Sequence, residues 1–343
     1  MIYMELNLLF LVKRRKIMRG FYLSFLSLGW LVIAMAPPAA ERNIVNREQG
    51  YLPGLMIYVN IKTPNPSGND TIVEIPPAGW KISHVDPTKG AIVEEDKITW
   101  DTKETSNYII YSYAVNPPET AAGNALFTGT INGLAMGGDT AIAPHVKDPI
   151  GIFEDHVSFG GVPLGDASYD SQKDEYTVIG SGRAPDPSAH CAYRKISGPV
   201  SISAEVTDEI SSSSSWLGAG LCFYDELADD SFFYAFLIGT GNAAYLAHGT
   251  VTSWQGIFPA NDGTSDNEIK IARDGDRITA YYFRNSSQEW ILLENIRLRP
   301  GVITDPIYVT LSSWTPEIQS YSTGFFTNVV LTLPSAVENW NLY

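Results

Sequence analysis

Cysteine, charge and helical periodicity are all scarce in this chain of 343 residues. Only two cysteines occur, so the fold cannot depend on a framework of several disulfides. Charged residues make up 18% of the chain, and the 38 acids outnumber the 23 bases, which gives a net charge of -15. Nucleic acids and anionic lipid surfaces repel a negative chain, so neither is expected as a partner.

The residue patterns of common catalytic sites are also missing. No Gly-x-Ser-x-Gly sequence marks a hydrolase nucleophile, and no Glu-x-Asp-x-x-Glu sequence marks a retaining glycosidase of sandwich fold. Gly180-Ser181-Gly182 lacks the third glycine and the lysine of a phosphate-binding loop. The five histidines have no metal-ligand spacing, and His190 is expected to be a hydrogen-bonded core residue of a strand. We therefore expect no enzymatic activity.

Residues 1–40 have the composition of a secretory signal peptide. A basic patch precedes an apolar run of about 15 residues, 21–35, and small residues follow it. A membrane span needs roughly 20 apolar residues, so an uncleaved anchor is the weaker alternative. Met18 is the expected true start, because it gives a leader of standard length, and cleavage is expected after Ala36 or near Ala40. The protein is then secreted or held at the cell surface.

The rest of the sequence predicts an all-β fold, because short runs of Val, Ile, Thr, Tyr and Phe alternate with turn-forming clusters. Residues 41–134 contain about seven such runs, as an immunoglobulin-like β-sandwich does. Residues 152–334 contain about eleven, which fits a jelly-roll sandwich of two sheets. Residues 135–151 are rich in Gly, Ala and Pro and are predicted to be a linker. Residues 335–343 are predicted to be a tail or the start of a further module.

Period-2 alternation predicts which side chains point into each core. In the first block, every second residue from Leu55 to Ile61 is apolar. In the second block, every second residue from Val200 to Val206 is apolar, and Ile278, Ala280 and Tyr282 share a face. Asp274-Gly275 between two such runs predicts a hairpin, because glycine readily adopts positive φ.

The first block resembles a module that recurs in large exported bacterial proteins, often in tandem. The shared motifs are Tyr51-Leu52-Pro53-Gly54, residues 74–80 (EIPPAGW), Ile98-Thr99-Trp100, residues 113–118 (YAVNPP) and residues 123–129 (GNALFTG). The resemblance implies a non-catalytic spacer or adhesive module. Trp80 and Trp100 are its expected core residues, because apolar burial must stabilise a sandwich that has no disulfide.

The second block resembles a concanavalin A-like, laminin-G-like module of exported bacterial proteins. The matching segments are residues 164–170 (LGDASYD), 176–182 (YTVIGSG), 190–198 (HCAYRKISG), 219–223 (AGLCF), 279–282 (TAYY) and 327–329 (TNV). The chain departs from the family at Val157-Ser158, where Asp-Ile is favoured, and after Gly182. The glycines of residues 161–182 are expected to form turns, and the acids of this segment to be solvated loop residues.

Aromatic side chains are the remaining candidates for ligand binding. The chain has 8 tryptophans and 18 tyrosines, and the C–H faces of sugars stack on flat exposed rings. Trp254 and Trp314 lie in turn-rich stretches and are the predicted ligand-binding pair, with a plug over the sandwich as the alternative role for each. Trp216 and Trp290 adjoin strands and are predicted to be core residues.

Two further groups could hold a calcium ion or a disulfide. Asp225, Asp229 and Asp230 lie between two strands, where loop carboxylates could bind calcium; the alternative is a solvated turn. No other cofactor is expected. Cys191 and Cys222 could form a disulfide in an exported protein, or they could be two small buried hydrophobic residues.

Together these features predict a non-catalytic extracellular recognition module that binds carbohydrate or a cell-surface partner. The expected partner is an extracellular polysaccharide or a cell-surface protein, and a membrane would be contacted only through the leader or through modules outside this sequence. Two alternatives stay open. One is a purely structural, adhesive spacer of a larger surface protein, and the other is an accessory part of a carbohydrate-active enzyme.

Overall fold

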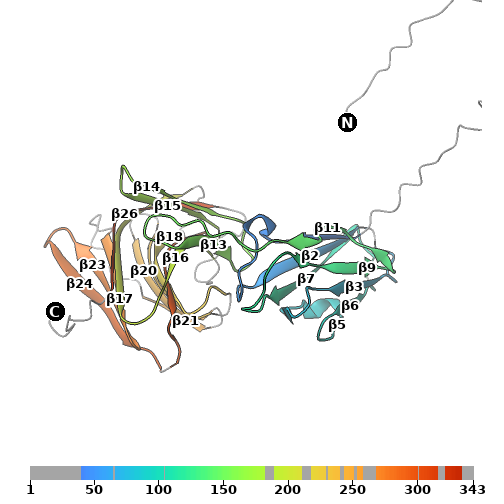
Figure 1. The fold of residues 1–343 in the computed structure, drawn as a ribbon. Coiled ribbons are helices and arrows are strands. Elements are labelled where there is room, and N and C mark those ends of the chain that lie inside the picture. The colour runs from blue at the N-terminus through green and yellow to red at the C-terminus, as the bar shows by residue number, and fades with distance from the viewer. Residues whose placement is uncertain are drawn as a thin grey trace, which may run out of the picture. The chain divides into compact units, whose positions relative to one another are not determined.

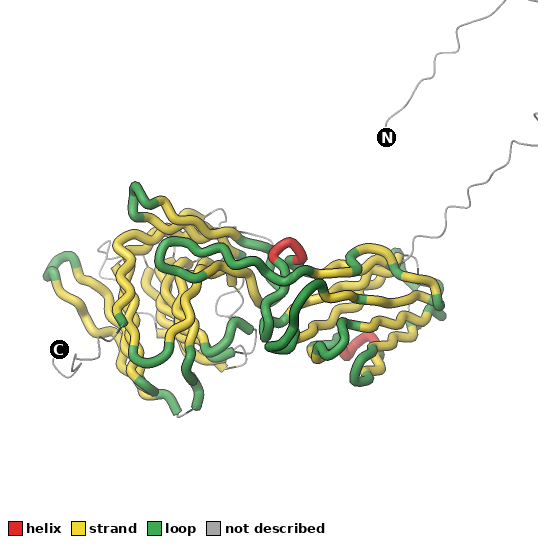
Figure 2. Tube along the Cα trace, viewed as in Figure 1, coloured by secondary structure: helices red, strands yellow, loops and turns green. Residues whose placement is uncertain are grey.

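The protein is described here by a computed structural model, in which strands and loops account for almost all of the described residues (Figure 2). The described residues are 40–64, 66–103, 105–181, 189–210, 218–228, 231–239, 243–250, 253–257, 268–299, 301–315 and 321–333. The predicted signal peptide up to residue 39 and the predicted tail, 335–343, lie outside them. Within the described residues the chain is all-β, and its only helices are the two 3-10 turns Arg47–Gln49 and Pro87–Lys89. None of the described helices could span a bilayer.

The strands β1 to β12 form a first sandwich (Figure 1). One sheet has the order β11-β1-β2-β7-β4, the other has the order β10-β9-β3-β6-β5, and β12 pairs with β8 alone. The bounds are β1 (Glu41–Ile44), β2 (Ile57–Pro64), β3 (Thr71–Ile75), β4 (Lys81–Ser83), β5 (Ala91–Val93), β6 (Ile98–Asp101), β7 (Tyr108–Asn116), β8 (Ala125–Leu126), β9 (Thr128–Ile131), β10 (Leu134–Ala135), β11 (Gly137–Gly138) and β12 (Ala141–Ile142). Trp80 and Trp100 are buried in the core cluster of this sandwich, as predicted.

An ion pair lies inside this core. The Arg42 guanidinium donates two hydrogen bonds of 2.7 Å to the Glu74 carboxylate, and the Tyr113 hydroxyl donates a third of 2.6 Å. Burial raises the pKa of Glu74, although the hydrogen bonds and the charge of Arg42 oppose the rise. Gly129 lies beside this carboxylate, and a Cβ at Gly129 would be only 2.7 Å from the carbonyl oxygen of Val73. Glu74 of the EIPPAGW motif and Gly129 of the GNALFTG motif therefore pack against each other inside the first sandwich.

The prediction of a linker over residues 135–151 is wrong for the first half of this segment. The strands β10, β11 and β12 lie at residues 134–142 and pair with β9, β1 and β8 of the first sandwich. The short side chains of this segment give no apolar period, yet its backbone completes sheet edges. Gly138 has φ +80°, and a Cβ there would lie 2.8 Å from the backbone nitrogen of Arg42, so the close pairing with β1 requires glycine.

The strands β13 to β26 form a second sandwich of two seven-stranded sheets (Figure 1). The sheet that we call the β18 sheet has the order β13-β16-β25-β18-β19-β20-β21, and the sheet that we call the β17 sheet has the order β14-β15-β26-β17-β22-β23-β24. The bounds are β13 (Asp155–Phe159), β14 (Asp166–Asp170), β15 (Glu175–Gly180), β16 (Ala189–Ile196), β17 (Val200–Ile210), β18 (Gly218–Tyr224), β19 (Phe233–Gly239), β20 (Ala243–Thr250), β21 (Ser253–Ile257), β22 (Glu268–Asp274), β23 (Arg277–Arg284), β24 (Glu289–Arg297), β25 (Ile307–Trp314) and β26 (Ser322–Thr332).

The predicted core faces are confirmed for β2, β17 and β23, except that Leu55 precedes β2 and packs outside the core of the first sandwich. Alternate residues of β17 from Val200 to Val206 are buried between the two sheets, and so are Ile278 and Ala280 of β23. Gly275 and its neighbour Asp276 form the two-residue loop between β22 and β23, as the hairpin signal predicts. The strands β13, β14 and β21 are not predicted, and all three lie at sheet edges.

The segment 161–182 is therefore more regular than expected. Asp174 lies in an exposed turn, as expected, but Asp166 and Asp170 stand at the two ends of β14 and Glu175 begins β15. The strand β14 pairs along its whole length with β15, and β15 continues the sheet by pairing with β26.

The β18 sheet is apolar on both faces. One face contributes to the core between the sheets, and the other carries a second buried cluster that includes Cys222, Tyr224 and Trp314. Leu55 of the first sandwich belongs to this second cluster. Every residue of β18 is buried as a result.

Candidate functional site

The outer face of β23 and β24 carries a strip of aromatic and aliphatic side chains. Because β23 turns every second side chain into the core, Tyr281 and Phe283 point outward. On β24, Leu292 lies opposite Tyr281, and Trp290 lies opposite Phe283. We call these four residues the Trp290 strip. The prediction of Trp290 as a core residue is wrong, since its outward position on an edge strand leaves it 38% exposed.

The rings of the strip support one another. The Phe283 and Trp290 centroids are 5.4 Å apart, with an angle of 68° between the ring planes. Lys270 of the neighbouring β22 places its Nζ 5.9 Å from the centroid of the Trp290 ring. Leu292 is 51% exposed beside them. An exposed indole that is braced in this way is a suitable platform for the apolar face of a sugar ring.

Two carboxylates lie beside the strip on the same sheet. Glu268 of β22 precedes Ile269, which pairs with Tyr282, so the register places Glu268 next to Phe283. Glu205 of β17 lies directly opposite Glu268. Burial, and then the negative charge of Glu205, raises the pKa of Glu268. Carboxylates at this position can accept hydrogen bonds from ligand hydroxyl groups, while their charge disfavours an anionic ligand.

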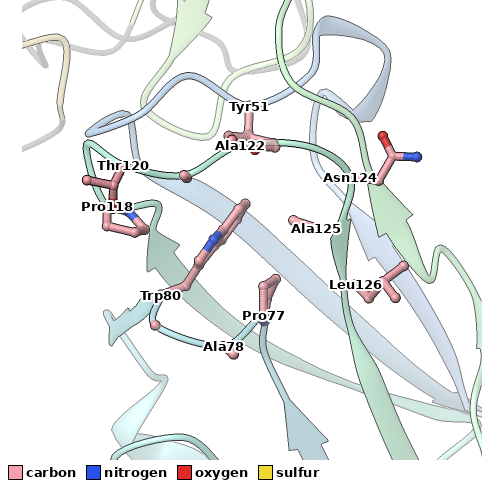
Figure 3. Close-up of a pocket in the computed structure, with 12 residues that line it drawn as sticks. Tyr51, Pro77, Ala78, Trp80, Pro118, Thr120, Ala122, Asn124, Ala125 and Leu126 are labelled. Atoms are coloured by element: carbon pink, nitrogen blue, oxygen red, sulfur yellow. The ribbon is translucent and has the colours of Figure 1, made fainter.

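The first sandwich has a separate open groove of about 510 Å³. Figure 3 shows Trp80 and Pro77 on one wall, Ala125 and Leu126 on the facing wall, and Tyr51 across one end. The Tyr51 and Trp80 rings meet edge to face at 5.0 Å, and the Tyr51 hydroxyl donates a hydrogen bond of 2.7 Å to the Gly123 carbonyl oxygen. The groove is therefore built on fixed aromatic residues.

The predicted binding pair Trp254 and Trp314 is not supported. Trp314 is the last residue of β25 and is 2% exposed, because it packs in the second apolar cluster of the β18 sheet. It therefore cannot be an exposed loop aromatic. Trp254 lies on β21, opposite Gly249, and its side chain is outside the described part of the chain, as is the whole of Trp216.

The predicted calcium ligands are described only in part. Asp229 and Asp230 lie outside the described residues. Burial raises the pKa of Asp225 to about 6, with a smaller contribution from the charge of Glu226, and its Oδ1 accepts a hydrogen bond of 2.8 Å from the Glu226 N–H. Among the described residues, no group of three or more His, Cys, Asp or Glu side chains could hold a metal ion.

The predicted disulfide is wrong, because Cys191 and Cys222 are both free and buried. Cys191 of β16 pairs with Ser312, and Cys222 of β18 pairs with Thr310, so β25 lies between the two cysteines. Two strand spacings separate their Cα atoms by at least ~9 Å, whereas a disulfide needs less than about 7 Å. Burial raises the pKa of both thiols. They are small core residues, which was the alternative interpretation.

His190 is a buried, hydrogen-bonded residue, as predicted. Its Nδ1 lies 2.8 Å from the Ser158 hydroxyl, and its Nε2 lies 3.1 Å from Nδ1 of His156. Burial, and then the charge of His156, lowers the pKa of His190 to about 3. A histidine held neutral in this way acts as a structural hydrogen-bonding group of β16.

The sequence contains the signal for the Trp290 strip. If Ile278, Ala280 and Tyr282 face the core, then Tyr281 and Phe283 must face outward, and two adjacent outward aromatic residues are unusual on a solvated strand. Trp290 itself gives no such signal, because a tryptophan beside a strand is usually a core residue.

Comparisons with known proteins leave the family open. No family model matches the chain, and no curated protein matches it. Among solved structures, a truncated AlyQ with CBM32 and alginate lyase domains is similar with a TM-score of 0.31 and 8% identity, over 86% of this chain and 97% of that chain. The Actinomyces fimbrial adhesin FimA is similar with a TM-score of 0.23 and 9% identity, over 76% of this chain and 97% of that chain. These TM-scores are too low to transfer a fold or a function.

Proposed function

We propose that this protein is a non-catalytic extracellular recognition protein whose second sandwich binds a neutral polysaccharide on the outer face of β22, β23 and β24. The observation that supports the proposal is the exposure of Trp290, which is braced by Phe283 and Lys270. Sugar rings stack on such an indole, and Glu268 and Glu205 lie two and three strands across the sheet from Trp290, where a ligand of several sugar units would reach them with its hydroxyl groups. The acids and the net charge of -15 disfavour an anionic polysaccharide.

The proposal includes the arrangement of the chain. The first sandwich is an immunoglobulin-like spacer, the second is a concanavalin A-like jelly roll, and the leader directs the protein to the outside of the cell. Two facing sheets with a core between them in each sandwich support this assignment. Loops and strand faces of such sandwiches commonly carry binding sites on a rigid scaffold.

Affinity electrophoresis in gels that contain a neutral polysaccharide tests the proposal. The gels would contain β-glucan, mannan or xylan, with alginate as the acidic comparison. Retardation is expected in at least one neutral gel and not in alginate. Trp290→Ala should abolish the retardation, because the stacking platform is removed.

Tyr108→Ala provides the matched control. Tyr108 is 55% exposed on the first sandwich and has the Nζ of Lys62 5.1 Å from its ring centroid, so it is also an exposed aromatic residue beside a lysine. Retardation that survives Trp290→Ala, or that Tyr108→Ala removes equally, would contradict the proposed site. If no polysaccharide retards the protein, the spacer alternative is favoured.

A further inference from the structure

The groove of the first sandwich exists because a strand pairing stops. The strand β3 pairs with β9 as far as Ile75 opposite Thr128. Continuing this register would place Pro76 opposite Phe127 and Pro77 opposite Leu126. Proline has no N–H to donate, so the hydrogen-bonded ladder ends here and the two segments of the chain move apart. The space between residues 77–80 and 124–126 is the groove (Figure 3).

The groove therefore has an open strand edge. The strand β8 pairs with β12 alone, and the Phe127 N–H donates to the Thr140 carbonyl oxygen at 2.9 Å. Hydrogen-bonded and non-hydrogen-bonded pairs alternate along an antiparallel ladder, so Leu126 and Ala141 are a non-hydrogen-bonded pair. The N–H and C=O of Leu126 consequently point away from β12 and toward the groove. They face Pro77, which cannot donate to them.

The lining of the groove carries no charged side chain in a chain whose net charge is -15. Its polar side chains are Tyr51, whose hydroxyl is bound to Gly123, and Thr120 and Asn124. Leu126 is 63% exposed at the rim. An uncharged site with an apolar rim and a free backbone donor and acceptor suits a peptide backbone with uncharged side chains.

We propose that the groove binds an extended, uncharged peptide segment, which adds to β8 as a further strand. The Leu126 N–H and C=O provide the backbone hydrogen bonds. Trp80 contacts the peptide side chains that point inward, and the exposed Leu126 side chain contacts those that point outward. This peptide site is independent of the polysaccharide site on the second sandwich.

Fluorescence anisotropy of the full chain with labelled peptides tests the inference. The probes are acetylated and amidated heptapeptides of Val, Ile, Thr, Ser and Tyr in all arrangements of a positional library. Members that bind are expected to lose at least tenfold in affinity with Leu126→Asp, which places a charge at the rim. Leu134→Asp is the control, because Leu134 is 69% exposed on β10 and does not line the groove.

N-methylation of the best peptide distinguishes strand addition from side-chain contact alone. Methyl groups on one alternate set of amides should abolish binding, and methyl groups on the other set should be tolerated, because only every second residue faces β8. The inference is overturned if no heptapeptide binds, if both methylated sets bind equally well, or if Leu134→Asp weakens binding as much as Leu126→Asp.

Discussion

At the scale of single residues, the Arg42–Glu74 pair shows what it takes to keep charge inside a β-sandwich. Both side chains are almost fully buried, and the carboxylate is matched by the guanidinium and by the Tyr113 hydroxyl. Arg42 also donates a hydrogen bond of 2.8 Å to the Asp139 carbonyl oxygen and so ties β1 to the segment before β12. Buried ions of this kind are tolerated only when every partner is present.

Arg42→Met is accordingly expected to destabilise the first sandwich by about 3–5 kcal/mol, because it leaves the Glu74 carboxylate buried without its counter-ion. Urea unfolding of the full chain, followed by tryptophan fluorescence, measures the loss. Adding Glu74→Met to this variant should recover part of the stability, since the unpaired charge is then removed.

Arg47→Met is the control for this prediction. Arg47 bonds to Asp139 at 2.9 Å, but its side chain is 50% exposed, so the expected loss is only about 0–1 kcal/mol. Equal losses for Arg42→Met and Arg47→Met would show that burial does not determine the cost.

At the scale of elements, the sequence predicts strand interiors better than strand edges. The alternation in β17 and β23 is strong because one face of each strand is buried. The edge strand β14 has two exposed acids, and its backbone pairing with β15 leaves little trace in its composition. The strands β11 and β12 are also missed by the sequence, because each has only two residues and pairs through its backbone.

Alternation also cannot show whether the second face of a strand is covered. Trp314 and Trp290 both stand on the faces of their sheets that look away from the main core. The face around Trp314 is covered by further apolar residues, which include Leu55 from a distant part of the chain, whereas the face around Trp290 is open. Only tertiary structure separates these cases, so the sequence alone does not show that Trp314 is buried and Trp290 exposed.

The β22–β23 hairpin gives a prediction at this scale. Gly275 has φ +59°, and a Cβ there would meet nothing within 4 Å, so a substitution acts through the backbone alone. Gly275→Ala should destabilise the second sandwich by about 1–2 kcal/mol, and Gly275→Asn by less, because asparagine tolerates positive φ. Thermal unfolding by calorimetry measures both. Equal losses for alanine and asparagine would contradict a backbone origin.

At the scale of the whole molecule, a histidine links the segment before the second sandwich to both sandwiches. The Nδ1 of His145 lies 2.6 Å from the Gln49 carbonyl oxygen, and its Nε2 lies 2.8 Å from the carboxylate of Asp155 on β13. Both partners are acceptors, so the protonated ring satisfies both. The hydrogen bond with Asp155 raises the pKa of His145. Burial opposes ionisation of Asp155, but the hydrogen bonds from His145 and the Asp148 N–H outweigh it and lower its pKa.

The pH dependence of this link follows from the directions of the pKa shifts of His145 and Asp155. A raised histidine pKa contributes stability that is fully present below about pH 6.5 and is lost as the pH rises through the folded-state value. A lowered aspartate pKa contributes stability that is present above about pH 4 and is lost as the pH falls through the folded-state value. His145→Gln should therefore cost more stability at pH 5.5 than at pH 9.

Paired urea titrations of wild type and His145→Gln at the two pH values measure this difference. The comparison with wild type at each pH is needed because His190 has the opposite effect: its low pKa weakens the folded state as the pH falls below about 6.5. A loss that is the same at pH 5.5 and pH 9 would contradict protonation of His145 in the folded protein.

The burial of the β18 sheet on both faces determines where the second sandwich unfolds last. Amide protons exchange with deuterium only when their hydrogen bonds break, and those of β18 have protein on both sides and a strand along each edge. Deuterium uptake followed by mass spectrometry should be slowest in peptides that cover Ala219–Phe223 and much faster in those that cover β14 or β24. Under denaturing stress, the β18 layer should therefore be the part of the second sandwich that unfolds last, after the edge strands β14 and β24 have already separated.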